Sequence, residues 1–510
     1  MGKLGITLGA VAIAAVTGIG IHAAHAFCGF YVSGSGEKMF ADATQVVLMR
    51  DGTKTVLSMQ NDYKGPLSDF AMVVPVPVVL KEADVKTLPR DVFARIEALG
   101  SPRLVEYWEQ DPCPRPMPPR KYAPRDEMAA PGAMYDADDK MEKRPTVKIE
   151  AKFDVAEYKI LILSATDSTG LETWLKQNNY KIPDGAEPLL RPYVEAGSKF
   201  FVAKVDPKKV QMVDGRAELS PLRFHYDSDE FALPIRLGMA NSSGKQDLIV
   251  NIIAADKRYE TSNYKNVFIP TNFDVKDGVR TRFGEFYAAL FDKTIEKNPG
   301  SVVTEYAWAA TPGAMCDPCP PQLPTDADAM TLGGDIVGGK IAQGSYVLTR
   351  LHARYGKTDM KDDLRFKEGQ PVLGGREIWS KGGLEYGATP ASQNNFQARY
   401  AIRHWWTGAI ACKNPQRGVW GGNPNGGYQG PIAASKLAFA PRGNLALPNY
   451  IGRDLWEIGV KKYRPPAKPP GPALEKPLPK TKAMGFGLGA LGGLLLIGLG
   501  VMIVRRRRIG

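Results

Sequence analysis

The sequence predicts an α+β fold of hairpin-rich antiparallel sheets with several packed helices, arranged in two or more subdomains and followed by one C-terminal transmembrane helix. Short apolar or alternating runs between turn residues indicate strands. A few amphipathic runs indicate helices, but they do not alternate regularly with the strands. An apolar segment stands near each end of the 510-residue chain. The stretch between them is too long for one hydrophobic core.

Residues 1–26 are expected to be a cleaved signal peptide. An early lysine precedes a long uncharged run, which ends at Ala24 to Ala26, a small-x-small site that suits signal peptidase. An uncleaved N-terminal anchor is the alternative. We do not expect lipidation of Cys28, because His25 and Phe27 stand where a lipobox has small and aliphatic residues.

Residues 483–504 are expected to form the transmembrane helix, since they hold no charge. At 1.5 Å per residue they span about 33 Å, enough for a hydrocarbon core of roughly 30 Å. Arg505 to Arg508 follow, and the positive-inside rule keeps the tail 505–510 in the cytoplasm. The protein is therefore expected to be exported and anchored in the cytoplasmic membrane, with its body outside the cytoplasm. The tail also resembles the sorting tails of bacterial surface proteins, so surface display after tail processing stays open.

Gly485, Gly489 and Gly493 form two overlapping small-xxx-small patterns within this segment. Such patterns seat helix dimers in membranes. A homodimer through these glycines is the weaker alternative to a lone helix, because a segment this rich in glycine produces the pattern by coincidence.

The net charge of +12 lies almost entirely in residues 461–510 and Lys3, which leaves residues 4–460 close to neutral. Nucleic-acid binding needs a concentrated cationic face. We therefore expect no nucleic-acid partner, and we assign the positive charge to the linker and the anchor.

The exported part is expected to contain four segments. They are an N-terminal β-rich module (27–111), a disordered Pro-rich insert (112–146), an α+β body (147–463) and a Pro/Lys-rich tether (464–482). In polyproline geometry, at about 3.1 Å per residue, the tether holds the body some 50 Å or more from the membrane.

Individual elements follow from local patterns. Strands are expected at 158–164, 199–205, 301–309, 345–355 and 395–405, and helices at 168–179, 188–196 and 280–297. Two hairpins are expected, one joining 44–50 to 54–60 through Asp51-Gly52 and one joining 231–240 to 247–255. Ser168 or Thr169 should cap the first helix, whereas 449–460 is ambiguous.

Several stretches together resemble the bacterial DUF2330 family. They are CGFYV (28–32), DFAMVVPVP (69–77), PLLRPYVEAGSKFFVAKV (188–205), LSPLRFHYDSDEFALPIRL (219–237), VVTEYAWA (302–309), CDPC (316–319), LTRLHARY (348–355) and ARYAIRHWWTG (398–408). The resemblance covers about residues 27–415. It implies secretion and placement in the cell envelope, but no activity, substrate or catalytic residue. Relatives often carry a second cysteine about five residues after the first, where this chain has Ser33.

Five cysteines enter an oxidising compartment, where cysteines usually pair. The missing partner near Ser33 marks Cys28 as the free thiol, so that two bridges form among Cys113, Cys316, Cys319 and Cys412, with their connectivity open. A redox centre at Cys316-x-x-Cys319 is disfavoured because prolines surround it and no helix start follows. Zinc needs about four ligands. Cys412 with His404, or Cys113, would have to complete the set, and zinc is disfavoured because the sequence holds no second Cys-x-x-Cys and no His-x-x-x-His.

Three histidines follow the signal peptide: His225, His352 and His404. They would form a catalytic or metal-binding trio if their strands adjoin. The commoner situation is a half-buried strand histidine paired with a neighbouring carboxylate. We therefore keep the trio as a weak candidate site, and we predict no catalytic residue, no metal and no cofactor.

Other candidate motifs are incomplete. Gly334 to Lys340 fits a phosphate-binding loop, but Ile341 replaces its Ser/Thr. Trp405, Trp406, Trp420 and Tyr428 form either a stacking platform for a sugar or peptide or ordinary core packing, which is the commoner case. The expected function is therefore that of a membrane-anchored cell-envelope protein with a binding, structural or assembly role and an envelope protein or glycan as ligand. The alternative is a periplasmic or surface hydrolase with a site formed from dispersed residues.

Overall fold

A computed structural model describes residues 30–33, 40–64, 70–113, 147–180, 182, 186–213, 216–241, 244–310, 318–320, 322–356, 358–377, 379–380, 383–426, 430–433, 440, 442–443 and 445–465. One compact unit ends at Tyr463, and a second unit begins at Arg464. Several predicted features lie outside the described residues: the signal peptide, the transmembrane segment with Gly485, Gly489 and Gly493, the Arg tail, and all but the first two residues of the insert and of the tether.

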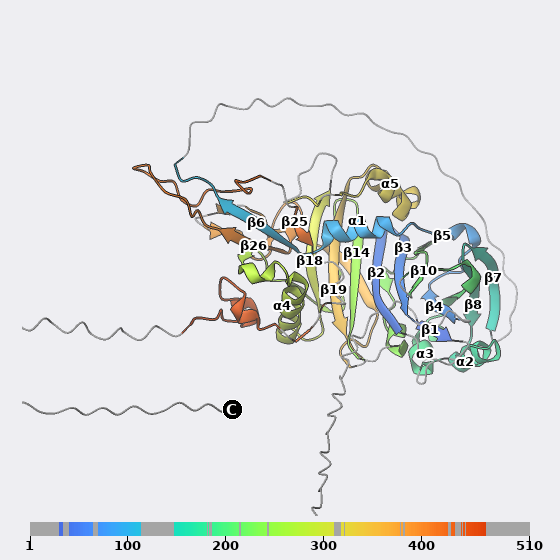
Figure 1. The fold of residues 1–510 in the computed structure, drawn as a ribbon. Helices are drawn as coiled ribbons and strands as arrows, with labels where there is room; N and C mark the ends of the chain where they lie inside the picture. Colours follow the sequence, from blue (N-terminus) through green and yellow to red (C-terminus); the bar gives the residue numbers. More distant parts are fainter. Residues whose placement is uncertain are drawn as a thin grey trace, which may run out of the picture. The chain divides into compact units, whose positions relative to one another are not determined.

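A large mixed sheet forms the centre of the compact unit (Figure 1). Its central strands, in spatial order, are β3 (Lys54–Lys64), β2 (Phe40–Asp51), β14 (Gln246–Ala254), β19 (Tyr346–Tyr355) and β18 (Ser301–Ala310). The predicted hairpin is confirmed, because β2 and β3 pair antiparallel down to Asp51 and Lys54. Gly52 has a φ of +54°, which suits a two-residue hairpin turn.

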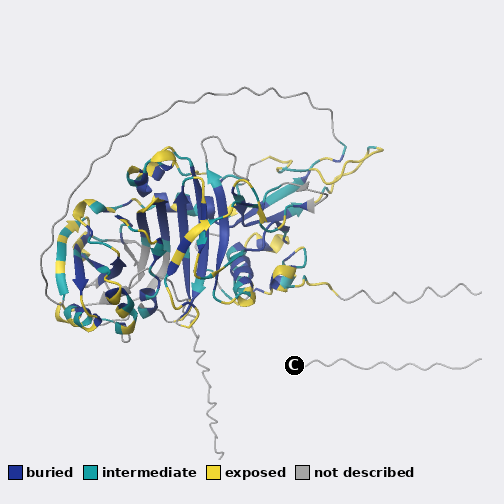
Figure 2. Ribbon diagram, turned by 180° about the vertical axis from the view of Figure 1, so that it is seen from behind, coloured by how far each residue is buried: buried dark blue, intermediate teal, exposed yellow. Residues whose placement is uncertain are grey.

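Both faces of this sheet are buried (Figure 2), because its strands alternate between two cores. In β2, Val46 and Leu48 pack into one core, whereas Val47 and Met49 pack into another. Helices α1 (Asp91–Gly100) and α4 (Phe283–Lys297) cover the face of the sheet on which His352 of β19 lies. The helix predicted at 280–297 is confirmed by α4.

The second predicted hairpin is wrong. Strand β14 pairs antiparallel with β19 and parallel with β2, so both of its edges are occupied by strands distant in sequence. Residues 231–240 contain only β13 (Ala232–Leu233), which pairs with β20 (Leu364–Gly369), and the start of a 3₁₀ turn at Leu237–Asn241. Pro234 directly follows β13 and has no N–H to continue a ladder.

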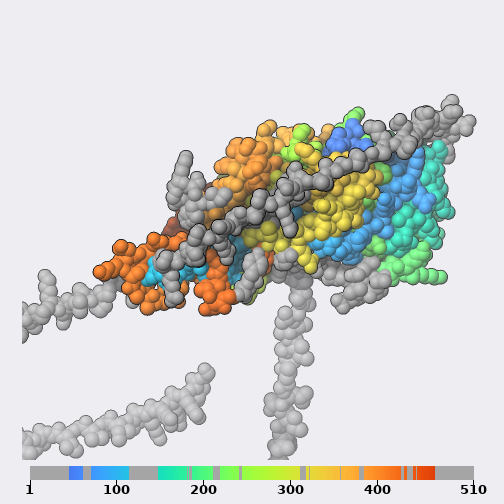
Figure 3. All heavy atoms as spheres, turned by 90° about the horizontal axis from the view of Figure 1, so that it is seen from above, coloured from blue at the N-terminus to red at the C-terminus, as the bar shows by residue number. Residues whose placement is uncertain are grey.

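A five-stranded antiparallel sheet lies at one end of the unit (Figures 1 and 3). Its order is β1 (Phe30–Ser33), β4 (Phe70–Val76), β9 (Lys199–Val205), β8 (Tyr158–Ala165) and β7 (Val147–Val155). Helices α2 (Ser168–Gln177) and α3 (Glu187–Glu195) bury Leu171 and Leu190 against it. The N-cap of α2 is Asp167, not Ser168 or Thr169, because its carboxylate accepts from the Gly170 N–H at 2.7 Å.

A smaller sheet lies at the opposite end (Figures 1 and 3). It contains β17 (Phe273–Asp274), β26 (Arg399–His404), β6 (Arg103–Glu109), β27 (Trp420–Gly421) and β28 (Ile432–Ala433). The strand predicted at 395–405 is therefore divided. Its first part, β25 (Asn395–Gln397), joins the large sheet, and its second part, β26, runs parallel to β6.

The other elements are short. The strands are β5 (Val85–Thr87), β10 (Gln211–Val213), β11 (Arg216–Glu218), β12 (Leu222–Asp227), β15 (Arg258–Thr261), β16 (Lys265–Phe268), β21 (Val372–Gly374), β22 (Trp379–Ser380), β23 (Gly383–Leu384) and β24 (Thr389–Pro390), and the helices are α5 (Asp326–Ala329), α6 (Asp335–Val337) and α7 (Gly339–Ala342). The fold is α+β-like and mostly sheet, with mixed rather than purely antiparallel sheets. Within the residues described, we find no helix whose length and apolarity would let it span a bilayer.

Candidate functional site

His352 lies at the centre of a buried charge network. It sits in the middle of β19 and is 1 % exposed. Its Nδ1 lies 2.6 Å from Glu305 Oε1, and its Nε2 lies 3.0 Å from Asp247 Oδ1. The imidazole stacks on the Phe291 ring of α4 at a centroid distance of 3.7 Å. Both ring nitrogens are thus engaged by carboxylates.

The network continues in both directions along β19, because residues 350, 352 and 354 share one face of the strand. Arg350 donates to Glu305 at 2.7 Å and to Glu97 of α1 at 2.5 Å. Arg354 donates to Asp247 at 2.8 Å. Glu305 lies at a bulge in the β18–β19 pairing, and bulges redirect side chains.

Two further charged residues complete the network. Arg442, in the segment after β28, donates to Asp247 at 3.0 Å and also to Asp292 of α4. The cations of the network are Arg350, His352, Arg354 and Arg442, and its anions are Glu97, Asp247, Asp292 and Glu305. The charges therefore balance only when His352 carries a proton.

The pKa shifts agree with this balance. Burial disfavours the charged form of Glu305, but His352 and Arg350 outweigh it and lower the pKa of that carboxyl to about 2. Burial also disfavours the imidazolium, yet Glu305 and Asp247 together raise the pKa of His352 above its ordinary value. Burial raises the pKa of Tyr287, whose hydroxyl donates to Glu305 at 2.8 Å. The two carboxylates that contact the His352 ring therefore favour its charged form.

The structure does not bring the three histidines together. His225 lies on β12 with its Nε2 3.4 Å from Asp84 Oδ1. His404 lies on β26, in the small sheet, where its Nε2 is 2.7 Å from Glu106 and its ring stacks on Trp108. Within the described ranges, no two of these histidines share a partner and no group of three or more His, Cys, Asp or Glu side chains is arranged to hold a metal ion.

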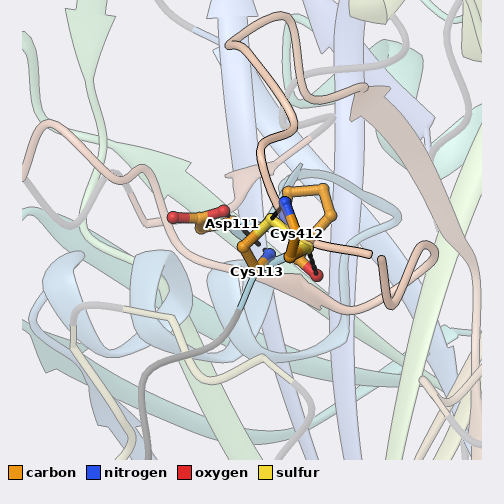
Figure 4. The surroundings of a disulfide bond; sticks show 4 residues. Asp111, Cys113 and Cys412 are labelled. Atoms are coloured by element: carbon orange, nitrogen blue, oxygen red, sulfur yellow. Dashed lines mark hydrogen bonds between the residues drawn. A yellow bond between two sulfur atoms is a disulfide. The ribbon is translucent and has the colours of Figure 1, made fainter. Parts of the chain in front are cut away.

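A disulfide joins Cys113 to Cys412 across 299 residues, with a Cα–Cα distance of 5.6 Å (Figure 4). It connects the segment after β6 to the loop that follows β26. The Cys113 N–H donates to Asp111 at 2.9 Å. Cys319 is disulfide-bonded too, whereas Cys28 and Cys316 lie outside the described residues.

Two of the predicted platform residues lie close together: Trp405 directly follows β26, and Trp420 lies in β27 and is partly exposed. Trp405 is 60 % exposed, and its ring meets that of Trp420 edge to face at 4.9 Å. Arg417 lies over the Trp405 ring at 5.9 Å. Trp406 is partly buried, and Tyr428 lies outside the described residues. We call Trp405, Trp420 and Arg417 the aromatic platform.

Glu109 holds the aromatic platform in place. This carboxylate is 1 % exposed and accepts hydrogen bonds from the Arg417 side chain at 2.7 Å and from the N–H groups of Gly418 and Trp406 at 2.7 and 3.0 Å. The hydrogen bond from Arg417 is the main cause that lowers the pKa of Glu109 to about 2. The loop is therefore fixed at Glu109 as well as at the disulfide.

Sequence reasoning missed the acids of both sites. Glu109, Asp247 and Glu305 stand in strand patterns that look ordinary. The alternation Arg350-x-His352-x-Arg354 was a usable signal, because period two places all three cations on one face of a strand. A buried face with three cations requires acids from its neighbours.

The fold and the two sites define a mixed-sheet protein with a buried charge network and a surface aromatic loop. Residues 22–367 match the bacterial family described as "Uncharacterized protein conserved in bacteria" (DUF2330), and the chain belongs to this family. The match includes His352 and its neighbours on β19, but it ends before β26 and the aromatic platform. No curated protein and no solved structure matches the chain.

Stability should fall as the pH rises through the folded pKa of His352. Because that pKa is raised, the imidazolium contributes stability that is fully present below its unfolded pKa, about 6.5, and lost above the folded value. Urea denaturation across pH 6–10 should show this alkaline loss in the wild type. His225→Gln should retain it, because His225 is partly exposed and outside the network.

His352→Gln should abolish the loss of stability at alkaline pH. It should also lower the free energy of unfolding near neutral pH by about 3–5 kcal/mol, because it leaves buried carboxylates without a compensating charge. If that variant does not fold, NMR titration of the His352 ring in the wild type serves instead. A ring pKa at or below 6.5 would contradict the charged network.

Mass spectrometry of the unreduced protein should find one peptide that links Cys113 to Cys412. We expect a second that links Cys319 to Cys316, because Cys113 and Cys412 pair with each other and the family resemblance marks Cys28 as the free thiol. Iodoacetamide should label Cys28 alone. A peptide that links Cys319 to Cys28, with Cys316 labelled, would refute this assignment.

Proposed function

We propose that the chain is an exported cell-envelope protein that binds an envelope glycan and catalyses no reaction. Its body stands outside the cytoplasm, on the tether 464–482 and the transmembrane helix 483–504. The leader-like residues 1–26, the uncharged 483–504 segment and the arginines after it support this topology. The disulfide between Cys113 and Cys412 supports an oxidising compartment.

The observation that carries the binding role is the exposure of Trp405. Trp405 is 60 % exposed, so a ligand that stacks on its ring removes apolar surface from water. Trp456 is exposed as well, but among the described residues no second aromatic ring is seen to contact it, whereas Trp405 has Trp420 beside it. Its neighbours limit its movement, since Trp420 contacts its edge and the loop is tied down at Cys412 and Glu109. A platform ordered in advance loses little conformational entropy on binding.

A glycan suits this surface better than a peptide strand. The apolar face of a sugar ring stacks on an indole, while its hydroxyl groups need polar partners around the ring. Residues 405–426 contain Lys413, Arg417 and several asparagines but no Asp or Glu. A glycan that carries carboxylate or phosphate groups would therefore meet no repulsion from within this loop.

No observation favours the hydrolase alternative. The strongest candidate base, His352, is buried, and both of its ring nitrogens already contact carboxylates. A general base must reach the proton that it abstracts in a bound substrate. His225 and His404 lie on separate strands, each with its own acid.

Trp405→Ala should weaken binding to polysaccharide purified from a bacterial envelope by at least about tenfold, or about 1.4 kcal/mol, because the stacking face is lost. Calorimetry with the full chain in detergent micelles measures this. Trp456→Ala is the matched control, since Trp456 is 69 % exposed, also carries a cation, Lys461, over its ring and lies outside the platform. Equal affinities of the two variants, or binding to envelope protein alone, would overturn the glycan assignment.

Protease added outside the cytoplasmic membrane of spheroplasts should degrade the body and leave a short fragment that contains Arg505 to Arg508. An epitope tag after Gly510 reports this fragment on an immunoblot. Lysed spheroplasts are the control for protease access. A body that resists protease until lysis would show that the proposed topology is wrong.

A further inference from the structure

A hollow of about 370 Å³ lies beside the C-terminal end of α4, at the edge of the buried charge network. Five charged side chains line it: Lys245, Asp292, Glu296, Arg354 and Asp359. The backbone turn at 299–301 forms another part of its wall. Its size is in the range of small-molecule sites in proteins.

The cations of this hollow retain donors for a ligand. Among the described residues, Arg354 donates one hydrogen bond, from Nη1 to Asp247, and its Nε lies 3.8 Å from Asp292, beyond hydrogen-bond distance. The Lys245 ammonium lies 3.3 Å from Asp359 and the side chain is 55 % exposed. A guanidinium held at one end is preorganised to receive a carboxylate at the other.

The acids of the hollow stand on α4. Asp292 and Glu296 are four residues apart, so they lie on one face of the helix. The Asp292 side chain is 35 % exposed and Arg442 fixes its position. Glu296 is 67 % exposed, and its one ion pair among the described residues is with Lys293. Both carboxylates can therefore accept hydrogen bonds from an ammonium group in the hollow.

We propose that this hollow binds a small zwitterion, a free amino acid or a dipeptide. Arg354 and Lys245 hold its carboxylate, and Asp292 and Glu296 hold its ammonium group. A simple anion would lie beside three carboxylates and a simple cation beside two cations, so only a ligand with both charges is complementary to the wall. The site shares no residue with the aromatic platform, so the proposal does not depend on the proposed glycan binding.

The test is calorimetry of the full chain in detergent micelles with L-alanine, L-alanyl-L-alanine, N-acetyl-L-alanine and L-alanine methyl ester. We expect one of the two uncapped compounds to bind at least about tenfold more tightly than both capped ones, because each cap removes one charge. Lys245→Gln and Glu296→Gln should each weaken that binding by about fivefold. Both residues are largely exposed, so the fold should survive.

Lys297→Gln is the control, since Lys297 is an exposed cation at the same helix end that does not line the hollow. It should bind like the wild type. The proposal is overturned if no compound binds at millimolar concentration, if capped and uncapped compounds bind alike, or if Lys245→Gln and Glu296→Gln match the control. Loss of glycan binding in Trp405→Ala with intact amino-acid binding would separate the two sites.

Discussion

The contact between the His352 imidazolium and the Glu305 carboxylate is the interaction on which the rest of the molecule depends. Both side chains are at most 1 % exposed, and an unpaired charge at such a buried position costs several kcal/mol. Their pairing requires β18 and β19 to be adjacent in one register, with the bulge at Glu305. Because side chains alternate between the two faces of β19, Arg350 and Arg354 lie on the same buried face as His352, and each needs a carboxylate partner there.

Those acids come from elements that are remote in the chain. Glu97 lies on α1 and Asp292 on α4, the two helices on this face of the sheet, and Asp247 lies on β14, the strand next to β19. Arg442 adds the segment after the small sheet. Apolar contacts drive these elements together, but they allow many registers. Charge complementarity in a low-dielectric core penalises each wrong register by leaving a charge unpaired. We infer that the network selects this arrangement from other compact ones.

Local pattern was enough to predict the elements whose partners are close in sequence. The β2–β3 hairpin and α4 belong to this group, since a turn or an amphipathic period defines them. Strand β14 does not: its neighbours β2 and β19 stand about 200 and 100 residues away, and no local property of Asp247 to Ala254 indicates them. The division of 395–405 between two sheets could not be predicted either, because the partners of its two parts, β18 and β6, are also distant in the sequence. For the sites, Trp405 was visible in the sequence, whereas Glu109 and Glu305 gain their roles only from tertiary neighbours.

The charge balance also distinguishes the centre of the network from its edge. A general base gains and loses a proton in every turnover. If His352 did so, the network would alternate between a neutral and a negative buried state, and part of the fold's stability would be lost with the proton. Arg354 differs, because it joins the network through one N–H and borders the hollow with the rest of its guanidinium. A ligand carboxylate at Arg354 would add to the network without changing its protonation. Loss of the His352 proton therefore lowers stability at the centre of the network, whereas a carboxylate at Arg354 leaves the protons of the centre in place.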